Sequence, residues 1–228
     1  MTLKEFTKEL NGNNRVEGEL IKAIFYSLFF SFGLFILLYY FKLQYIENFI
    51  SKYSFYLFFA ILSYAIVLPS IRQVRAYKNL TCMSGMMVGM TTGMIAGFLP
   101  GFFIGSTNGM LWGSVFGMGI GIFIGVWNGK CCGIMGIMEG LMAGFMGGIM
   151  GAMTAVMMIN DNLKVAGLIV FLISSVIIFL LNFMIYKETK ESERQVKEDY
   201  SLIIFISLIL TAITIFFMVY GPRSILFG

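Results

Sequence analysis

The sequence contains no histidine and few charged residues, and both absences limit what the protein can do. Charged residues make up 12% of the chain, about half the share that is typical of soluble domains. No polar stretch is long enough to bury a core of its own. Without histidine, the commonest transition-metal ligand and the usual general base are missing. The sequence also has no zinc-protease motif, phosphate-binding loop or nucleophile elbow, so we expect no enzyme.

Cysteine is scarce as well. There are three, and an odd number argues against a disulfide framework. Basic residues outnumber acidic ones by 16 to 12, but no basic stripe with interleaved aromatic residues lies outside the apolar segments. We therefore expect no nucleic-acid partner and attribute the excess to the basic bias of cytoplasmic loops in membrane proteins.

What the sequence does contain is long apolar runs. Hydrophobic residues make up 58% of the chain, and the mean hydropathy is +0.86. The first run is too long for the core of a signal peptide, so it is a retained span. A membrane span needs about 20 apolar residues. On that basis the chain has seven spans, near 21–42, 53–70, 82–106, 109–128, 131–159, 164–186 and 201–220. This pattern predicts an all-α integral membrane protein in the lipid bilayer.

The spans differ in composition. The first two and the last two are aromatic and aliphatic with little glycine, whereas the central three hold nearly all the glycine and most of the methionine. Residues 1–20 form either a short helix on the membrane surface or a solvated terminus. We expect a cytoplasmic N-terminal segment at 1–20, a two-helix hairpin with a basic loop at 21–80, a Gly/Met-rich three-helix core at 81–160, and a second hairpin at 161–228 with a charged cytoplasmic loop at 187–200.

The loops predict an orientation. Arg72, Arg75 and Lys78 lie in one connection, Lys130 lies in a second, and the charged segment 187–199 is a third. All three fall on the same side of the membrane, and the positive-inside rule makes that side cytoplasmic. We therefore expect a multi-pass protein of the cytoplasmic membrane with its N-terminus inside and its C-terminus outside.

Glycine recurs at every fourth position from Gly85 to Gly133 without a break. Such small-xxx-small series mark helices whose backbones approach closely. The contacts could form within one chain, between subunits, or both. The packing glycines of the third and fifth spans are Gly85, Gly89, Gly93, Gly97, Gly136, Gly140, Gly144 and Gly148.

Two stretches of this register echo one another: "GFFIGSTNG" at 101–109 and "GIFIGVWNG" at 121–129. Each ends in Asn-Gly, a turn dipeptide. The simpler interpretation makes Asn108 and Asn128 turn residues at opposite faces of the membrane. The alternative sets their amides at the two mouths of a transport pathway.

In the fifth span the glycines and methionines occupy nearly opposite faces at about 100° per residue. Glu139 falls within the methionine face, nine residues after Lys130 or about 13 Å along a helix, which predicts a depth near the middle of the bilayer. An ionisable residue at that depth is costly and points to function.

Cys82 begins the third span and Cys131 and Cys132 begin the fifth, so all three cysteines are expected at one membrane face. Thioethers and thiolates are soft ligands that select Cu(I). Methionine also fills gaps between helices, so the sulfur is either a ligand path or packing. The candidate metal ligands are Cys82, Cys131, Cys132, Met87, Met90, Met135, Met138, Met142 and Met146.

The pairs Met138-x-x-x-Met142 and Gly140-x-x-x-Gly144 give this span a resemblance to the transmembrane core of copper uptake proteins of the Ctr type. The resemblance covers this one span and implies Cu(I) chemistry.

Three functions are therefore open. The first is transport of a soft cation, Cu(I) or Ag(I), along a Met/Cys-lined path between the glycine-packed helices. The second is an oligomeric ion or small-solute channel in which Glu139 forms a charge ring. The third is an assembly or accessory membrane protein that transports nothing. We expect a homo-oligomer and no required cofactor, with Cu(I) as the transported or bound ion.

Overall fold

The computed structural model describes residues 16–41, 49–76, 81–189 and 200–222. These residues contain no strand, and each of their long helices has an apolar segment that could cross a membrane. The prediction of an all-α, multi-pass membrane protein with seven spans is confirmed. The helices are α2 (Val16–Phe41), α3 (Phe49–Ala76), α4 (Cys82–Asn108), α5 (Met110–Gly129), α6 (Gly133–Met157), α7 (Leu163–Thr189) and α8 (Tyr200–Tyr220), with the short 3-10 helix η2 (Lys130–Cys132) between α5 and α6.

Several helices continue past the apolar segments that predict them. Helix α2 begins at Val16, five residues before the expected span, and α3 reaches Ala76 rather than residue 70. Hydropathy marks only the part of a helix that lies in lipid, whereas backbone hydrogen bonds continue into polar flanks. The surface helix considered for the N-terminal segment falls mostly in residues 1–15, which lie outside the described residues.

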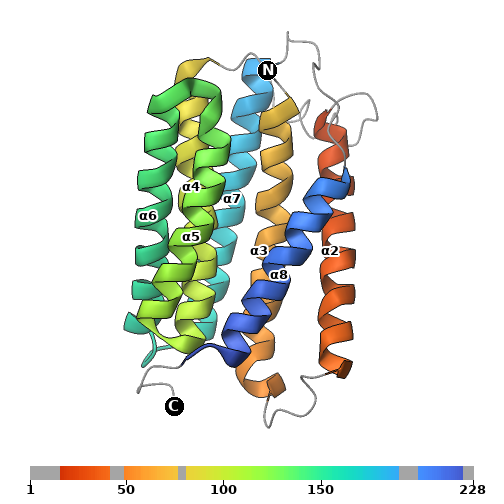
Figure 1. Cartoon of the computed structure of the whole chain (residues 1–228), viewed down its shortest axis with the longest axis vertical. Coiled ribbons are helices and arrows are strands. Elements are labelled where there is room, and N and C mark those ends of the chain that lie inside the picture. The colour runs from red at the N-terminus through yellow and green to blue at the C-terminus, as the bar shows by residue number, and fades with distance from the viewer. Residues whose placement is uncertain (1–15, 42–48, 77–80, 190–199, 223–228) are drawn as a thin grey trace.

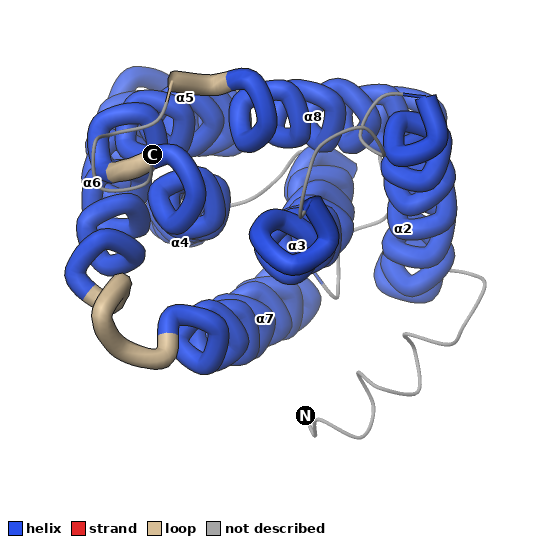
Figure 2. Tube along the Cα trace, turned by 90° about the horizontal axis from the view of Figure 1, so that it is seen from below, coloured by secondary structure: helices blue, strands red, loops and turns tan. Residues whose placement is uncertain are grey.

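The seven helices form two groups, one of which is packed much more closely than the other. Helices α4, α5 and α6 pack most extensively against one another, and we call them the glycine trio. Helix α3 is the hub of the remainder, in contact with α2, α4, α7 and α8. Although the trio is central in the sequence, it lies at one side of the molecule (Figures 1 and 2). Helix α6 packs extensively only on α4 and α5 among the described helices, so its outer face lies on the surface of the chain.

The trio is held by contacts between glycine backbones. A Cβ atom placed on Gly117 of α5 would lie 2.7 Å from the carbonyl oxygen of Gly97 in α4 and 2.9 Å from the Cα of Gly148 in α6. A Cβ on Gly121 would meet the Cα of Gly97 at 2.8 Å and that of Gly144 at 2.9 Å. Real side chains do not tolerate such distances, so these positions require glycine. The glycine register therefore packs within one chain.

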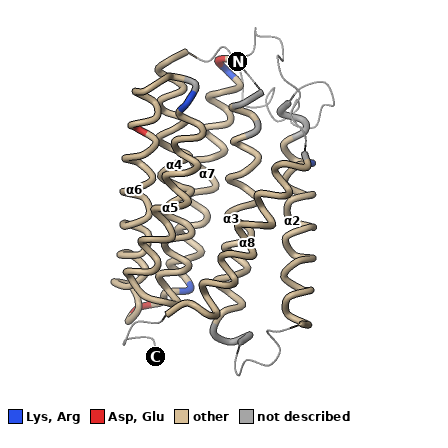
Figure 3. The backbone as a smooth tube through the Cα atoms, in the orientation of Figure 1, with Lys and Arg blue, Asp and Glu red and all other residues tan. Residues whose placement is uncertain are grey.

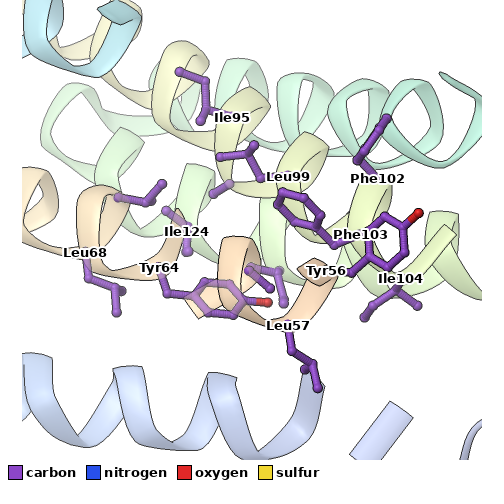
Figure 4. Packing of buried hydrophobic residues seen from close by; sticks show 14 of the residues in the cluster. Tyr56, Leu57, Tyr64, Leu68, Ile95, Leu99, Phe102, Phe103, Ile104 and Ile124 are labelled. Atoms are coloured by element: carbon purple, nitrogen blue, oxygen red, sulfur yellow. The ribbon is translucent and has the colours of Figure 1, made fainter. Parts of the chain in front are cut away.

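Between the trio and the hub lies the main hydrophobic core. Tyr64 and Leu68 of α3 belong to one buried cluster with Leu99 and Phe103 of α4 and Ile124 of α5 (Figure 4). All of these side chains are buried. Large aromatic and aliphatic side chains thus fill the wider space around α3, whereas glycine allows the close approach inside the trio.

Helix α2 is held to α8 partly by a cluster of buried serines. The hydroxyl of Ser27 donates to that of Ser207 at 3.1 Å, and the hydroxyls of Ser31 and Ser207 share a hydrogen bond of 2.8 Å. We expect Ser207→Ala to lower the free energy of unfolding by about 1 kcal/mol, because hydrogen bonds between membrane helices are typically worth that much. Thermal unfolding in detergent measures the change. Ser201→Ala, at an exposed position of the same helix, is the matched control. An equal loss in both variants would show that the cluster adds nothing specific.

Candidate functional site

Two of the three cysteines meet at one end of the trio. Cys82 is the first residue of α4 and Cys132 the last of η2. The thiol of Cys132 lies 3.0 Å from the carbonyl oxygen of Cys82, at hydrogen-bond distance for sulfur. This approach, predicted from the topology, is confirmed for these two residues. The side chain of Cys131 lies outside the described part of the structure.

Glu139 belongs to the same end of the molecule. It follows Cys132 by seven residues in the sequence. Helix α6 begins at Gly133, so Glu139 is six residues, or about 9 Å, along it. It therefore lies about a quarter of the way down the helix.

The methionines of α6 face outward. Met135, Met138, Met142 and Met146 are between 58% and 64% exposed, whereas Gly140 and the other glycines on the opposite side of the helix are buried. The two faces predicted from the helical period are thus both present, with glycine toward the trio. We call the outward side the Met face, which consists of Met135, Met138, Met142, Met146, Met150, Met153 and Met157.

Helix α4 carries a shorter stripe of exposed methionines beside the Met face. Met83, Met87, Met90 and Met94 all lie at the surface of the chain. A Cβ on Gly147 of α6 would run into the backbone of Met94, so the two helices touch there without a gap. The α4–α6 contact is closed by backbone atoms. Any sulfur-lined path must therefore follow the outer surfaces of the two helices, rather than the space between their glycines as the sequence suggested.

At the far end of α6 the surface becomes polar. A depression of about 560 Å³ is lined by Met158, Asn160, Asp161 and Asn162 of the loop and by the first turns of α7. The Met face thus runs from the thiols and Glu139 at one end to a carboxylate and two amides at the other. Asp161 was not a predicted site residue, because an acidic residue in a short loop is normally only solvated.

The two Asn-Gly pairs behave differently. Asn108 ends α4 and Gly109 has a φ of 103°, so this pair makes a turn as predicted. Asn108 is also fully buried, and its amide donates to the carbonyl oxygen of Phe217 in α8 at 2.7 Å. Its place at a turn matches the simpler of the two interpretations.

The second pair ends α5, and the turn follows directly after it. Helix α5 continues through Asn128 to Gly129, and the reversal comes at Gly133, whose φ is 69°. The buried amide of Asn128 donates to the hydroxyl of Thr92 in α4 at 3.0 Å. Asn128 and Gly129 thus close the span, as predicted, and the chain reverses in the residues that follow them. Thr92 was missed, since a threonine in an apolar helix can satisfy its hydroxyl on the helix backbone and so carries no signal of its own.

Charges gather toward the ends of the bundle (Figure 3). Lys130 is exposed in η2, at the end that also holds Cys132. Among the described residues, no three cysteine, aspartate or glutamate side chains come together closely enough to hold a metal ion. A metal at this end would therefore need methionine sulfur, or the undescribed Cys131 side chain, beside Cys82 and Cys132.

In comparisons with protein-family models, with curated proteins and with solved structures, the chain shows no match. The functional conclusion therefore depends on the residues described above.

Proposed function

We propose that this protein transports a soft monovalent cation, Cu(I) or Ag(I), across the membrane. The observation that carries the proposal is the meeting of Cys82 and Cys132 at one end of the continuous Met face. Thiolates and thioethers prefer soft ions to Na⁺, Mg²⁺ or Ca²⁺. The carboxylate of Glu139 supplies a negative charge that attracts the cation.

The route follows the Met face. Its methionines recur every three or four residues, which separates successive sulfurs by about 5–6 Å along the helix axis. A neutral thioether holds a monovalent soft ion weakly, so the ion can pass from one rung to the next. The thiols bind more tightly and form the end point. With the predicted orientation that end is cytoplasmic, and transport runs inward.

A path on the surface of one chain needs a cover that excludes lipid. We propose that a second copy of the chain supplies it by packing its α6 against the first. Helix α6 is suited to this because it packs extensively only on α4 and α5 among the described helices. The partly exposed Glu139 also favours a protein cover, because a carboxylate facing acyl chains is costly.

A second candidate function is favoured by the same exposed surface. Methionine side chains are flexible and adapt to varied partners. The Met face would then dock the helix of another membrane protein, with no ion involved. The channel alternative gains less support, because the glycine faces that would line its pore are occupied within one chain.

Soft-metal binding by the purified protein tests the proposal. We expect about one Ag(I) or Cu(I) per chain or per oligomer under reducing conditions. Replacing Cys82, Cys131 and Cys132 by serine should weaken binding by at least about 100-fold, because thiolate ligands are the tightest available to a soft ion. Isothermal titration calorimetry with Ag(I), in the presence of a competing chelator, measures the affinity.

The control replaces a sulfur far from the site. Met218 is fully buried in the α8 core, and Met218→Leu preserves its volume. It should bind metal like the unmodified protein. Absence of binding in the unmodified protein, or equal binding by the triple serine variant, would reject the transport proposal and leave the docking function.

A further inference from the structure

On the side of α5 away from α6, two apolar depressions lie on either side of a row of residues. The row is Gly119, Phe123 and Trp127, spaced one helical turn apart, and all three residues line both depressions. The first depression has a volume of about 420 Å³ and extends to Ile71 of α3 and Ile209 of α8. The second, of about 440 Å³, runs along the outer surface of α5. The rings of Phe123 and Trp127 pack edge to face at 5.3 Å and form a ridge between the two.

Gly119 lines both depressions, one helical turn before Phe123 in the row. It falls outside the every-fourth-residue register, and a Cβ placed on it would meet nothing within 4 Å. At Gly117 and Gly121, two residues away on either side, an added Cβ would instead collide with α4 and α6. Close packing of the helices therefore requires glycine at these two positions, but not at Gly119. The missing side chain leaves an open space beside the ridge.

The upper end of the ridge is basic. The second depression ends at Lys130, which is exposed. Tryptophan and lysine together are typical of the level at which lipid headgroups meet the hydrocarbon core. Basic residues there attract anionic headgroups.

From this arrangement we infer a binding site for an anionic diacyl phospholipid. The two acyl chains lie in the two depressions and straddle the Phe123–Trp127 ridge, and the phosphate lies beside Lys130. The two depressions match the two chains, their linings are apolar, and the positive charge lies only at the headgroup end. Gly119 leaves room for the chains to pass the foot of the ridge. The site is separate from the Met face, which belongs to α6.

Native mass spectrometry of the full chain, titrated with phosphatidylglycerol or phosphatidylcholine in detergent, tests the site. We expect phosphatidylglycerol to bind the unmodified protein more tightly than phosphatidylcholine. Gly119→Leu fills the junction of the depressions and should weaken binding of both lipids about tenfold. Lys130→Gln should lower the preference for the anionic lipid about fivefold and leave phosphatidylcholine unaffected, as loss of one interfacial charge predicts.

Two controls match these variants. A Cβ on Gly33 of α2 also meets nothing within 4 Å, so Gly33→Leu adds the same side chain away from the depressions. Lys164→Gln removes an exposed lysine at the start of α7, at the other end of the bundle. Both should bind lipid like the unmodified protein. Equal effects of Gly119→Leu and Gly33→Leu, or no preference for phosphatidylglycerol in the unmodified protein, would overturn the inference. Helix content measured by circular dichroism separates these results from misfolding.

Discussion

Gly121→Ala is expected to destabilise the protein by about 3 kcal/mol, at the upper end of the range for overpacked cores. The added methyl group would lie 2.8 Å from the Cα of Gly97 and 2.9 Å from the Cα of Gly144. Both contacts are with backbone, so no side chain can rotate away, and α4 and α6 must both move. Intrinsic helix propensity works in the opposite direction, since alanine is favoured over glycine by about 1 kcal/mol. A measured loss of stability therefore reports the packing alone.

Gly119→Ala is the matched control. It makes the same change two residues away in the same helix, at a position where a Cβ meets nothing within 4 Å. We expect it to be neutral or slightly stabilising. Reversible unfolding in mixed detergent micelles, followed by circular dichroism, gives both values. If the two variants had the same stability, the close approach of the three backbones in the trio would be wrong.

The contrast between these glycines indicates how much of the fold could be read from the sequence. The spans were predictable because each apolar run is as long as the membrane is thick. The glycine register predicted close packing, and Gly117 and Gly121 lie at such contacts. The partners of the register were not predictable, because a small-residue face looks the same whether it meets another span of its own chain or another subunit.

Part of the candidate site could likewise be predicted from the sequence, and part could not. The meeting of Cys82 and Cys132 followed from counting spans, since both residues begin spans that start at one membrane face. The position of Glu139 within α6 did not follow, because it depends on the residue at which α6 begins, and α6 begins only after η2.

The sequence also could not predict that the Met face is exposed on the outside of the chain. The helical period separates methionine from glycine in α6, but it does not say which side the other helices cover. The structure resolves this because the glycine side is occupied by α4 and α5. A methionine that only filled gaps would be expected at those contacts, where the spaces between helices lie. The exposed stripe therefore does not fill gaps inside the chain, and lipid, an ion or a partner remains to contact it.

Replacing Met142 and Met146 together by leucine is expected to reduce Ag(I) transport by at least about tenfold while leaving Ag(I) binding at the cysteines unchanged. In the double variant, Met138 and Met150 are the remaining methionines of the Met face on either side of the two replaced positions. They are 12 residues, or about 18 Å, apart along α6, whereas adjacent rungs are at most about 6 Å apart. An ion bound at one thioether of α6 would then have no other α6 thioether within reach. Leucine preserves the volume, so the fold should be retained at a cost under about 1.5 kcal/mol.

Uptake of Ag(I) into proteoliposomes that enclose a silver-sensitive dye measures the rate. Met218→Leu removes a sulfur from the buried core and should transport like the unmodified protein. The pair of measurements separates the two functions that the exposed Met face permits. A transport path depends on sulfur and fails when the rungs are removed, whereas a docking surface depends on shape and apolar area, which leucine supplies equally well. Unchanged uptake in the double variant would therefore remove the thioethers from the mechanism, and uptake absent from the unmodified protein would leave docking as the function of this face.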